Sequence, residues 1–154
     1  MAKSAARVLD HTAIESFLGN QSTGTLSLAK NNESYAIPVS FTYAPDVEDF
    51  YFRLGYGMDS RKREYIEATD RATFVVAADT DAGWKSVVAR GTLEHRNTVE
   101  NLDRVTPPDQ SASDADRELD IPFYHVFDTP SELVFTLARL RTTELTGVAQ
   151  AADD

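Results

Sequence analysis

The densest candidate for chemistry in this chain is the run Ser60-Arg61-Lys62-Arg63. Its hydroxyl, guanidinium and ammonium groups can all bind an anion, and backbone N–H groups at the start of a helix do so as well. Positive charge at a helix start opposes the helix dipole, and such local conflicts are typical of functional sites. The run therefore indicates a phosphate site. The alternative is a solvated helix face on which the basic residues pair with Glu64 and Glu67.

A second candidate is an aromatic-rich pair of predicted strands, Tyr35 to Tyr43 and Phe50-Tyr51-Phe52-Arg53. Aromatic side chains and a proline on neighbouring strands can form a flat slot for a planar ring, with backbone groups as hydrogen-bond partners. Ordinary core packing is the alternative for most of these side chains. A third candidate for ligand contact, Trp84-Lys85-Ser86, begins another predicted strand. The alternative is that Trp84 packs in the core or in an interface.

Catalytic constellations are sparse. There is no cysteine, no glycine-rich phosphate loop and no supported Ser/His/Asp order, and the three histidines lack metal-ligand spacing. His125, beside Tyr124, could transfer a proton, but a structural histidine is the simpler interpretation. A phosphate site and an aromatic slot without an acid–base set favour chemistry that is supplied by a bound cofactor.

The hydrophobic pattern predicts the elements that position these residues. A capping box of Thr12 and Glu15 predicts a first helix that Gly19-Asn20 ends, and Asp59 and Ser60 predict the start of a second. A third helix is possible over residues 98–105. Alternating hydrophobic residues predict six strands, with Pro38 on an edge or at a position where pairing is interrupted. The strands cover residues 24–29, 34–43, 50–54, 72–78, 84–93 and 132–140.

These elements predict a mainly β (α+β) fold, a six-stranded antiparallel barrel that is closed or partly closed, with two or three short helices. Residues 1–154 would form a single domain, which the chain length allows. Within it we expect a mobile loop over residues 107–120, which is rich in proline, serine and acids, and a frayed tail over residues 150–154.

Composition narrows the class of protein. A formal charge of −10 disfavours general nucleic-acid binding, and no apolar run is long enough to span a membrane. The N-terminal residues lack the apolar region of a secretory signal, so a cytoplasmic protein is expected. Fifteen Asp against ten Glu, with only four Lys beside eleven Arg, favour a halophilic source, because high salt screens such self-repulsion.

Taken together, these segments resemble the pyridoxamine 5'-phosphate oxidase-like, FMN-binding split-barrel proteins. The resemblance runs from about Thr12 to Arg96 and more weakly to Gly147. Its most specific element is the Ser-Arg-Lys step at residues 60–62. The strand patterns that accompany it are Gly24-Thr25-Leu26-Ser27-Leu28, Tyr35-Ala36-Ile37-Pro38-Val39-Ser40-Phe41, Phe50-Tyr51-Phe52-Arg53 and Val87-Val88-Ala89-Arg90-Gly91-Thr92-Leu93.

The resemblance implies a homodimer of six-stranded barrels with FMN in clefts at the subunit interface. Arg61 and Lys62 would bind the FMN phosphate, and Pro38, Val39 and Ser40 would border the flavin ring through backbone groups. Residues from Trp84 to Ser86 would reach the flavin of the other subunit. The cofactor-binding set implied in this way is Pro38, Val39, Ser40, Phe52, Arg53, Ser60, Arg61, Lys62, Trp84 and Ser86.

The expected function is therefore that of an FMN-binding oxidoreductase-like protein with an unknown small-molecule substrate. The chain lacks the C-terminal Trp and Arg-x-His elements of the vitamin-producing oxidase, and Ala36-Ile37-Pro38 stands where that enzyme has an arginine for the flavin. We therefore expect a substrate other than pyridoxamine phosphate. Two alternatives remain open: a deazaflavin-dependent reductase on the same barrel, and a module that binds flavin without turnover.

Overall fold

The computed structural model of the chain describes residues 6–57, 61–99 and 133–151. This part forms seven strands and two helices. In chain order they are β1 (Ala6–Val8), α1 (His11–Gly19), β2 (Thr23–Lys30), β3 (Glu33–Ala44), β4 (Asp49–Gly57), α2 (Arg61–Ala68), β5 (Arg71–Thr80), β6 (Gly83–Val99) and β7 (Leu133–Gln150).

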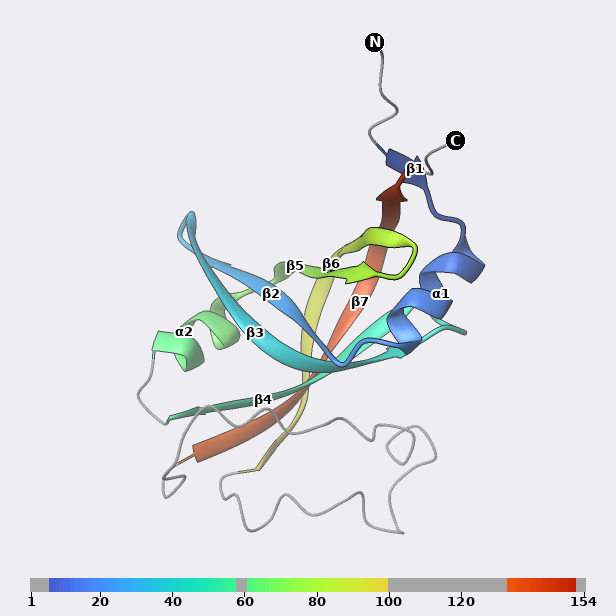
Figure 1. Cartoon of the computed structure of the whole chain (residues 1–154). Coiled ribbons are helices and arrows are strands. Elements are labelled where there is room, and N and C mark those ends of the chain that lie inside the picture. The colour runs from blue at the N-terminus through green and yellow to red at the C-terminus, as the bar shows by residue number, and fades with distance from the viewer. Residues whose placement is uncertain (1–5, 58–60, 100–132, 152–154) are drawn as a thin grey trace, which may run out of the picture.

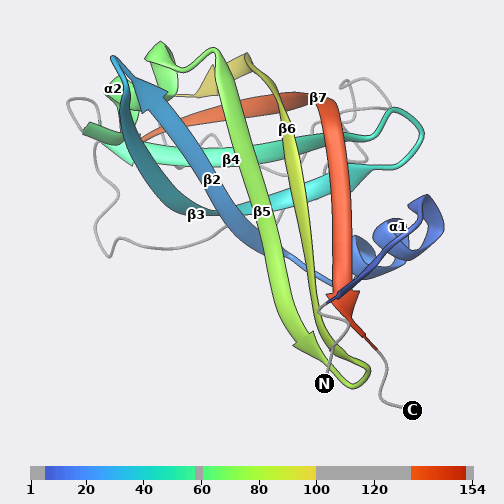
Figure 2. The same cartoon turned by 90° about the horizontal axis from the view of Figure 1, so that it is seen from above.

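The strands form one antiparallel sheet that closes on itself. Its order is β1-β7-β4-β3-β2-β5-β6, and an additional pairing of β7 with β6 joins the two sides into a six-stranded barrel with β1 as an outer addition. Figures 1 and 2 show α2 beside the β2–β3 hairpin on one side of the barrel and α1 on the opposite side. The predicted split-barrel class, mainly β with short helices, is confirmed.

Several local predictions were wrong or incomplete. The first helix begins at His11 rather than at a Thr12–Glu15 capping box, because the Asp10 carboxylate accepts a hydrogen bond of 2.8 Å from the Ala13 amide. Residues 98 and 99 belong to β6 and not to a third helix. The rest of that predicted helix, the loop at 107–120 and the last three residues lie outside the described residues.

Pro38 lies where β3 is paired on one side only, as the sequence predicted. It is opposite Thr25 of β2, whereas the ladder between β3 and β4 begins at Ser40. Because proline has no N–H to donate, this one-sided position leaves the ladder to β4 intact.

The core of the barrel is built around an aromatic cluster. The Phe74 ring, 1 % exposed, lies 4.7 Å from the ring of Phe52, 5.1 Å from that of Phe41 and 5.3 Å from that of Phe50, centroid to centroid. Tilted and edge-on contacts at these distances are the favourable arrangements of aromatic pairs. They connect β5 to β3 and β4 across the inside of the barrel.

Closure of the barrel depends on a close approach of β6 and β7. The register between the two strands shifts after Arg90, and at Gly91 the backbone of Arg141 comes so near that a Cβ atom would overlap the Arg141 carbonyl oxygen. Only glycine lets two backbones approach in this way. Gly91 is therefore required by packing.

A buried ion pair stabilises the pairing of β7 with β4. Asp49, 4 % exposed at the start of β4, accepts hydrogen bonds from the Arg139 guanidinium, with Nε at 2.8 Å, and from the Thr142 amide at 3.0 Å. The hydrogen bond to Asp49 raises the pKa of Arg139. The Arg139 guanidinium also lies 5.8 Å from the ring centroid of Tyr51. The carboxylate thus holds β4 and β7 in register.

We predict that Gly91→Ala lowers the free energy of unfolding by about 2–3 kcal/mol, on the scale of overpacking in a close-packed interior. The matched control is Gly19→Ala, because a Cβ there meets no heavy atom within 4 Å; it should change stability by less than about 1 kcal/mol. Urea denaturation followed by circular dichroism measures both. Equal stability of Gly91→Ala and the unchanged protein would contradict the close approach.

Candidate functional site

Helix α2 is fixed to the barrel through its C-terminal half. Ile66 is fully buried, and the Thr69 hydroxyl donates to the carbonyl oxygen of Tyr65 at 2.6 Å. The same hydroxyl bridges to β2, where it accepts from the Ala29 amide at 3.1 Å. A ring nitrogen of His95 lies 3.0 Å from the Ile66 carbonyl oxygen. Arg61 and Lys62, at the start of the helix, take no part in these contacts.

The β2–β3 hairpin fixes the orientation of the helix from the side. Lys30 pairs with Glu64, and the Tyr65 hydroxyl donates to Glu33 at 3.0 Å. The rings of Tyr35 and Tyr65 lie 5.0 Å apart. The hydrogen bond from Lys30 lowers the pKa of Glu64. The Glu64 carboxylate is therefore engaged on the side of the helix that faces the hairpin.

The first turn of α2 presents two cations. Helix α2 begins at Arg61, as the sequence predicted, and Arg63 pairs with Glu67 at 3.3 Å. Among the residues that the structure describes, no carboxylate lies within ion-pair distance of Arg61 or Lys62. Lys62 is half-buried, and this burial lowers its pKa. Ser60, the predicted hydroxyl of this site, lies outside the described residues.

This arrangement fits an anion. Partial burial of an ammonium group without a compensating charge costs free energy, which an anionic ligand at the same place would offset. The anion would also be attracted by the positive end of the helix dipole. The alternative interpretation, in which the basic run pairs with Glu64 and Glu67, is correct only for Arg63 with Glu67. Glu64 pairs with Lys30 instead.

The outward face of the sheet carries the next group of predicted residues. Ser40 of β3 and Arg53 of β4 are directly opposite each other, and Pro38 shares the outward side by strand alternation. Ser40 is only 1 % exposed. Val39 and Phe52 alternate to the inside and are buried in the core. Their contribution to any ligand site on this face would therefore come from the backbone.

Trp84 and Ser86 lie elsewhere on the barrel. Both are in β6, next to the hairpin with β5, and the Trp84 amide donates to Gln150 at 3.3 Å. Figure 2 shows this hairpin at the opposite end of the barrel from α2. Trp84 is 37 % exposed and borders a hollow of about 310 Å³ with Ala77, Ala78 and Ser86. Within one chain, therefore, these residues do not join Arg61 and Lys62.

Sequence reasoning missed the residues that position α2. The pairing of Arg63 with Glu67 has helical i,i+4 spacing, which a sequence can reveal. Lys30 and Glu64 are 34 positions apart, and Thr69 and Ala29 are 40 apart. No local pattern connects residues so distant, and only the fold brings them together.

No helix within the three described segments has both the length and the apolar character needed to cross a bilayer.

Comparison with solved structures shows a shared fold. A candidate pyridoxamine 5'-phosphate oxidase from Corynebacterium glutamicum superposes with a TM-score of 0.64 at 18 % identity, with 100 % of both chains covered. An FAD-binding protein from Mesorhizobium loti gives 0.63 at 19 % identity, covering 96 % of this chain and 98 % of its own. The FAD-binding protein from Mycobacterium smegmatis gives 0.61 at 15 % identity, covering 95 % and 100 %.

Curated proteins give no match to the chain. A family model does: the model described as pyridoxamine 5'-phosphate oxidase matches residues 10–149, from the residue that caps α1 almost to the end of β7. The match therefore includes every strand of the closed barrel, together with α2 and its two cations. The chain belongs to the pyridoxamine 5'-phosphate oxidase family.

Proposed function

We propose that this chain binds FMN, with the phosphate at the first turn of α2, and that the bound flavin serves an oxidoreductase reaction. The observation that carries the proposal is the pair Arg61 and Lys62. In a chain of net charge −10, two adjacent cations at a helix start have no ion-pair partner among the described residues. A phosphate dianion would complement both, with the Ser60 hydroxyl as a further donor.

The flavin ring would lie on the outward face of β3 and β4. Gly57, the last residue of β4, lies about 13 Å along the strand from Arg53, at roughly 3.3 Å per residue. Helix α2 is the next element of the chain. A flavin mononucleotide with its ribityl chain extended can bridge such a span. Arg53 would meet the polar edge of the ring, and the backbone of residues 38–40, buried Ser40 included, and of residue 52 would border it.

A second copy of the chain would complete the site. Trp84 and Ser86 cannot reach α2 within one chain, yet the resemblance assigns them to the flavin site. A two-fold dimer in which each β5–β6 hairpin approaches the partner's flavin satisfies this assignment. It would also cover Trp84 and the neighbouring alanines, an apolar patch that a monomer leaves in water.

The bound flavin would supply hydride or electron transfer, and the residues of this chain would anchor and orient it. Arg61 and Lys62 would hold the phosphate, while Arg53 would place a positive charge near the ring. The substrate would be a small molecule. FAD is the second candidate cofactor, since the similar proteins from Mesorhizobium loti and Mycobacterium smegmatis are named for FAD binding.

The cofactor can be identified directly on the purified full chain. We expect a yellow protein with the two-band visible spectrum of an oxidised flavin, and FMN as the mass released on denaturation. Release of FAD would replace FMN by the second candidate, and a single band at shorter wavelength would indicate a deazaflavin. A bound flavin that no nicotinamide donor reduces would favour the non-catalytic module. A colourless protein that binds none of the added cofactors would contradict the proposal.

We predict that Arg61→Ala and Lys62→Met each weaken FMN binding about 10- to 150-fold, because each removes one charge-assisted contact of roughly 1.5–3 kcal/mol. Methionine retains the partly buried stem of Lys62. Quenching of flavin fluorescence during titration of the apo-protein measures the dissociation constants. Arg90→Ala is the control, since Arg90 pairs with Glu144 away from α2. Unchanged affinity in both α2 variants would contradict the phosphate assignment.

We also predict that the flavin-bound protein is a homodimer, of about 34 kDa from two chains of 17.0 kDa. Light scattering coupled to size exclusion measures the mass at micromolar concentration. Trp84→Ala should weaken both dimer formation and FMN binding, because the partner's hairpin contributes to each. A flavin-bound species of about 17 kDa would rule out a site shared between subunits.

A further inference from the structure

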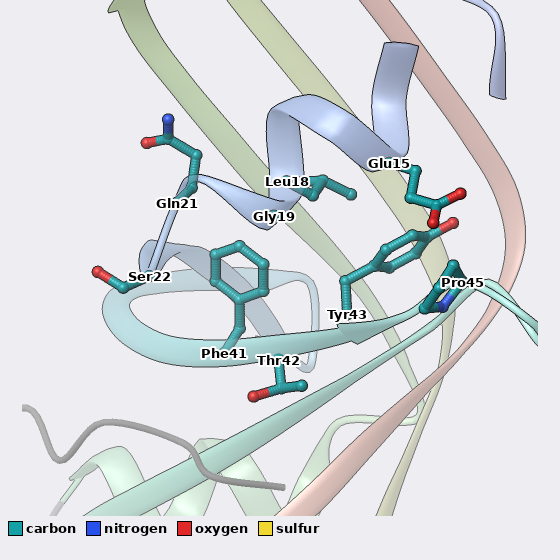
Figure 3. Close-up of a pocket in the computed structure, with 9 residues that line it drawn as sticks. All are labelled: Glu15, Leu18, Gly19, Gln21, Ser22, Phe41, Thr42, Tyr43 and Pro45. Atoms are coloured by element: carbon teal, nitrogen blue, oxygen red, sulfur yellow. The ribbon is translucent and has the colours of Figure 1, made fainter. Parts of the chain in front are cut away.

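A groove of about 430 Å³ lies between α1 and one edge of β3, away from α2. We refer to it as the α1–β3 groove. Figure 3 shows Glu15 and Leu18 approaching it from the helix, and Phe41 and Tyr43 from the strand. Its volume lies within the range of small-molecule sites, and its lining mixes apolar and polar residues.

The groove borders an open strand edge. The ladder between β2 and β3 ends where Thr23 is opposite Ser40, and the Phe41 amide makes one further bond, 3.1 Å, to the Ser22 carbonyl oxygen. Successive residues of a strand direct their backbone groups to opposite sides, so those of Tyr43 point the same way as those of Phe41. Within the described part of the chain, no group hydrogen-bonds to the amide or carbonyl of Tyr43 on the side of β3 that faces Ser22.

The charge around the groove is negative. Burial, followed by the carboxylates of Glu48, Glu15 and Asp49, raises the pKa of Tyr43 to about 12. His11 lies 2.7 Å from Glu48, and Arg139 neutralises Asp49. Glu15 has no ion-pair partner among the described residues. The described lining of the groove includes neither lysine nor arginine.

Gly19, at the end of α1, lines the groove without a side chain. Its φ is not in the left-handed region, and a Cβ built on it would meet nothing within 4 Å. Neither backbone conformation nor packing in the chain itself requires glycine here, unlike at Gly91. The missing side chain leaves room along the helix side of the groove, where a ligand would lie.

We propose that the α1–β3 groove binds a small organic cation, a protonated amine on a flat apolar body. The flat body would pack against Pro45 and the half-buried ring of Tyr43, whose face also attracts a cation. The ammonium group would pair with Glu15 and donate to the open Tyr43 carbonyl. An added peptide strand fits less well, because the open edge extends only from Phe41 to the end of β3 and α1 lies alongside it.

The proposal does not rest on flavin binding, because its residues are separate from those assigned to the flavin. The test is a calorimetric titration of the full chain at low salt with three probes of nearly equal shape: benzylammonium, benzyl alcohol and benzoate. We expect benzylammonium to bind at least about fivefold more tightly than benzyl alcohol, the scale of one exposed ion pair with a cation–π contact. Benzoate should bind more weakly than either.

Two variants localise the effect. Glu15→Gln should abolish the preference for the ammonium over the alcohol, whereas the control Glu144→Gln, which removes an exposed carboxylate on β7, should keep it. Gly19→Leu should weaken both probes at an unchanged melting temperature, because there is space for its side chain. Amide NMR shifts of Tyr43 and Ser22 should follow the benzylammonium titration.

Equal binding of benzylammonium and benzyl alcohol would overturn the proposal, as would an ammonium preference that survives Glu15→Gln. Absence of benzylammonium binding at millimolar concentration would overturn it as well. Since FMN binding is measured separately on Arg61 and Lys62 variants, failure of either proposal can be recognised without the other.

Discussion

The structure depends on β7, because this strand closes the sheet into a barrel. Its first half pairs with β4, and nearly its whole length pairs with β6. Two local features make this double pairing possible. Gly91 lets the β6 and β7 backbones approach, and Asp49 ties the start of β4 to Arg139 and Thr142. The first feature removes a steric barrier, whereas the second satisfies a buried carboxylate that would otherwise destabilise the fold.

Closure determines what the candidate site can be. In a closed ring every strand has one inward and one outward face, so Phe52 fills the core while Arg53, its neighbour, faces out beside Ser40. The same ring fixes where β4 ends and hence where α2 begins. Lys30 then holds Glu64 against the β2–β3 hairpin, and no described carboxylate lies within ion-pair distance of Arg61 or Lys62.

The sequence predicted what local patterns encode. Alternation identified the six barrel strands, and the start of α2 at the basic run was correct. The cap of α1 was not, because Asp10 and Thr12 are both good capping residues and local chemistry does not choose between them. The helix expected from residue 98 failed for a different reason: residues 97–99 pair with β7, some 40 positions away. The need for glycine at position 91 and the α1–β3 groove are equally non-local.

The two proposed ligand sites follow from one electrostatic arrangement. An acidic chain with few cations places several of its described charges in pairs, such as Arg90 with Glu144 and Arg139 with Asp49. Such pairs largely cancel each other's field beyond a Debye length. The field that a ligand encounters is therefore dominated by charges left out of pairs. At α2 these are positive, and at the α1–β3 groove Glu15 is negative. The barrel lies between them, so an anion and a cation would be drawn to opposite sides of the same molecule.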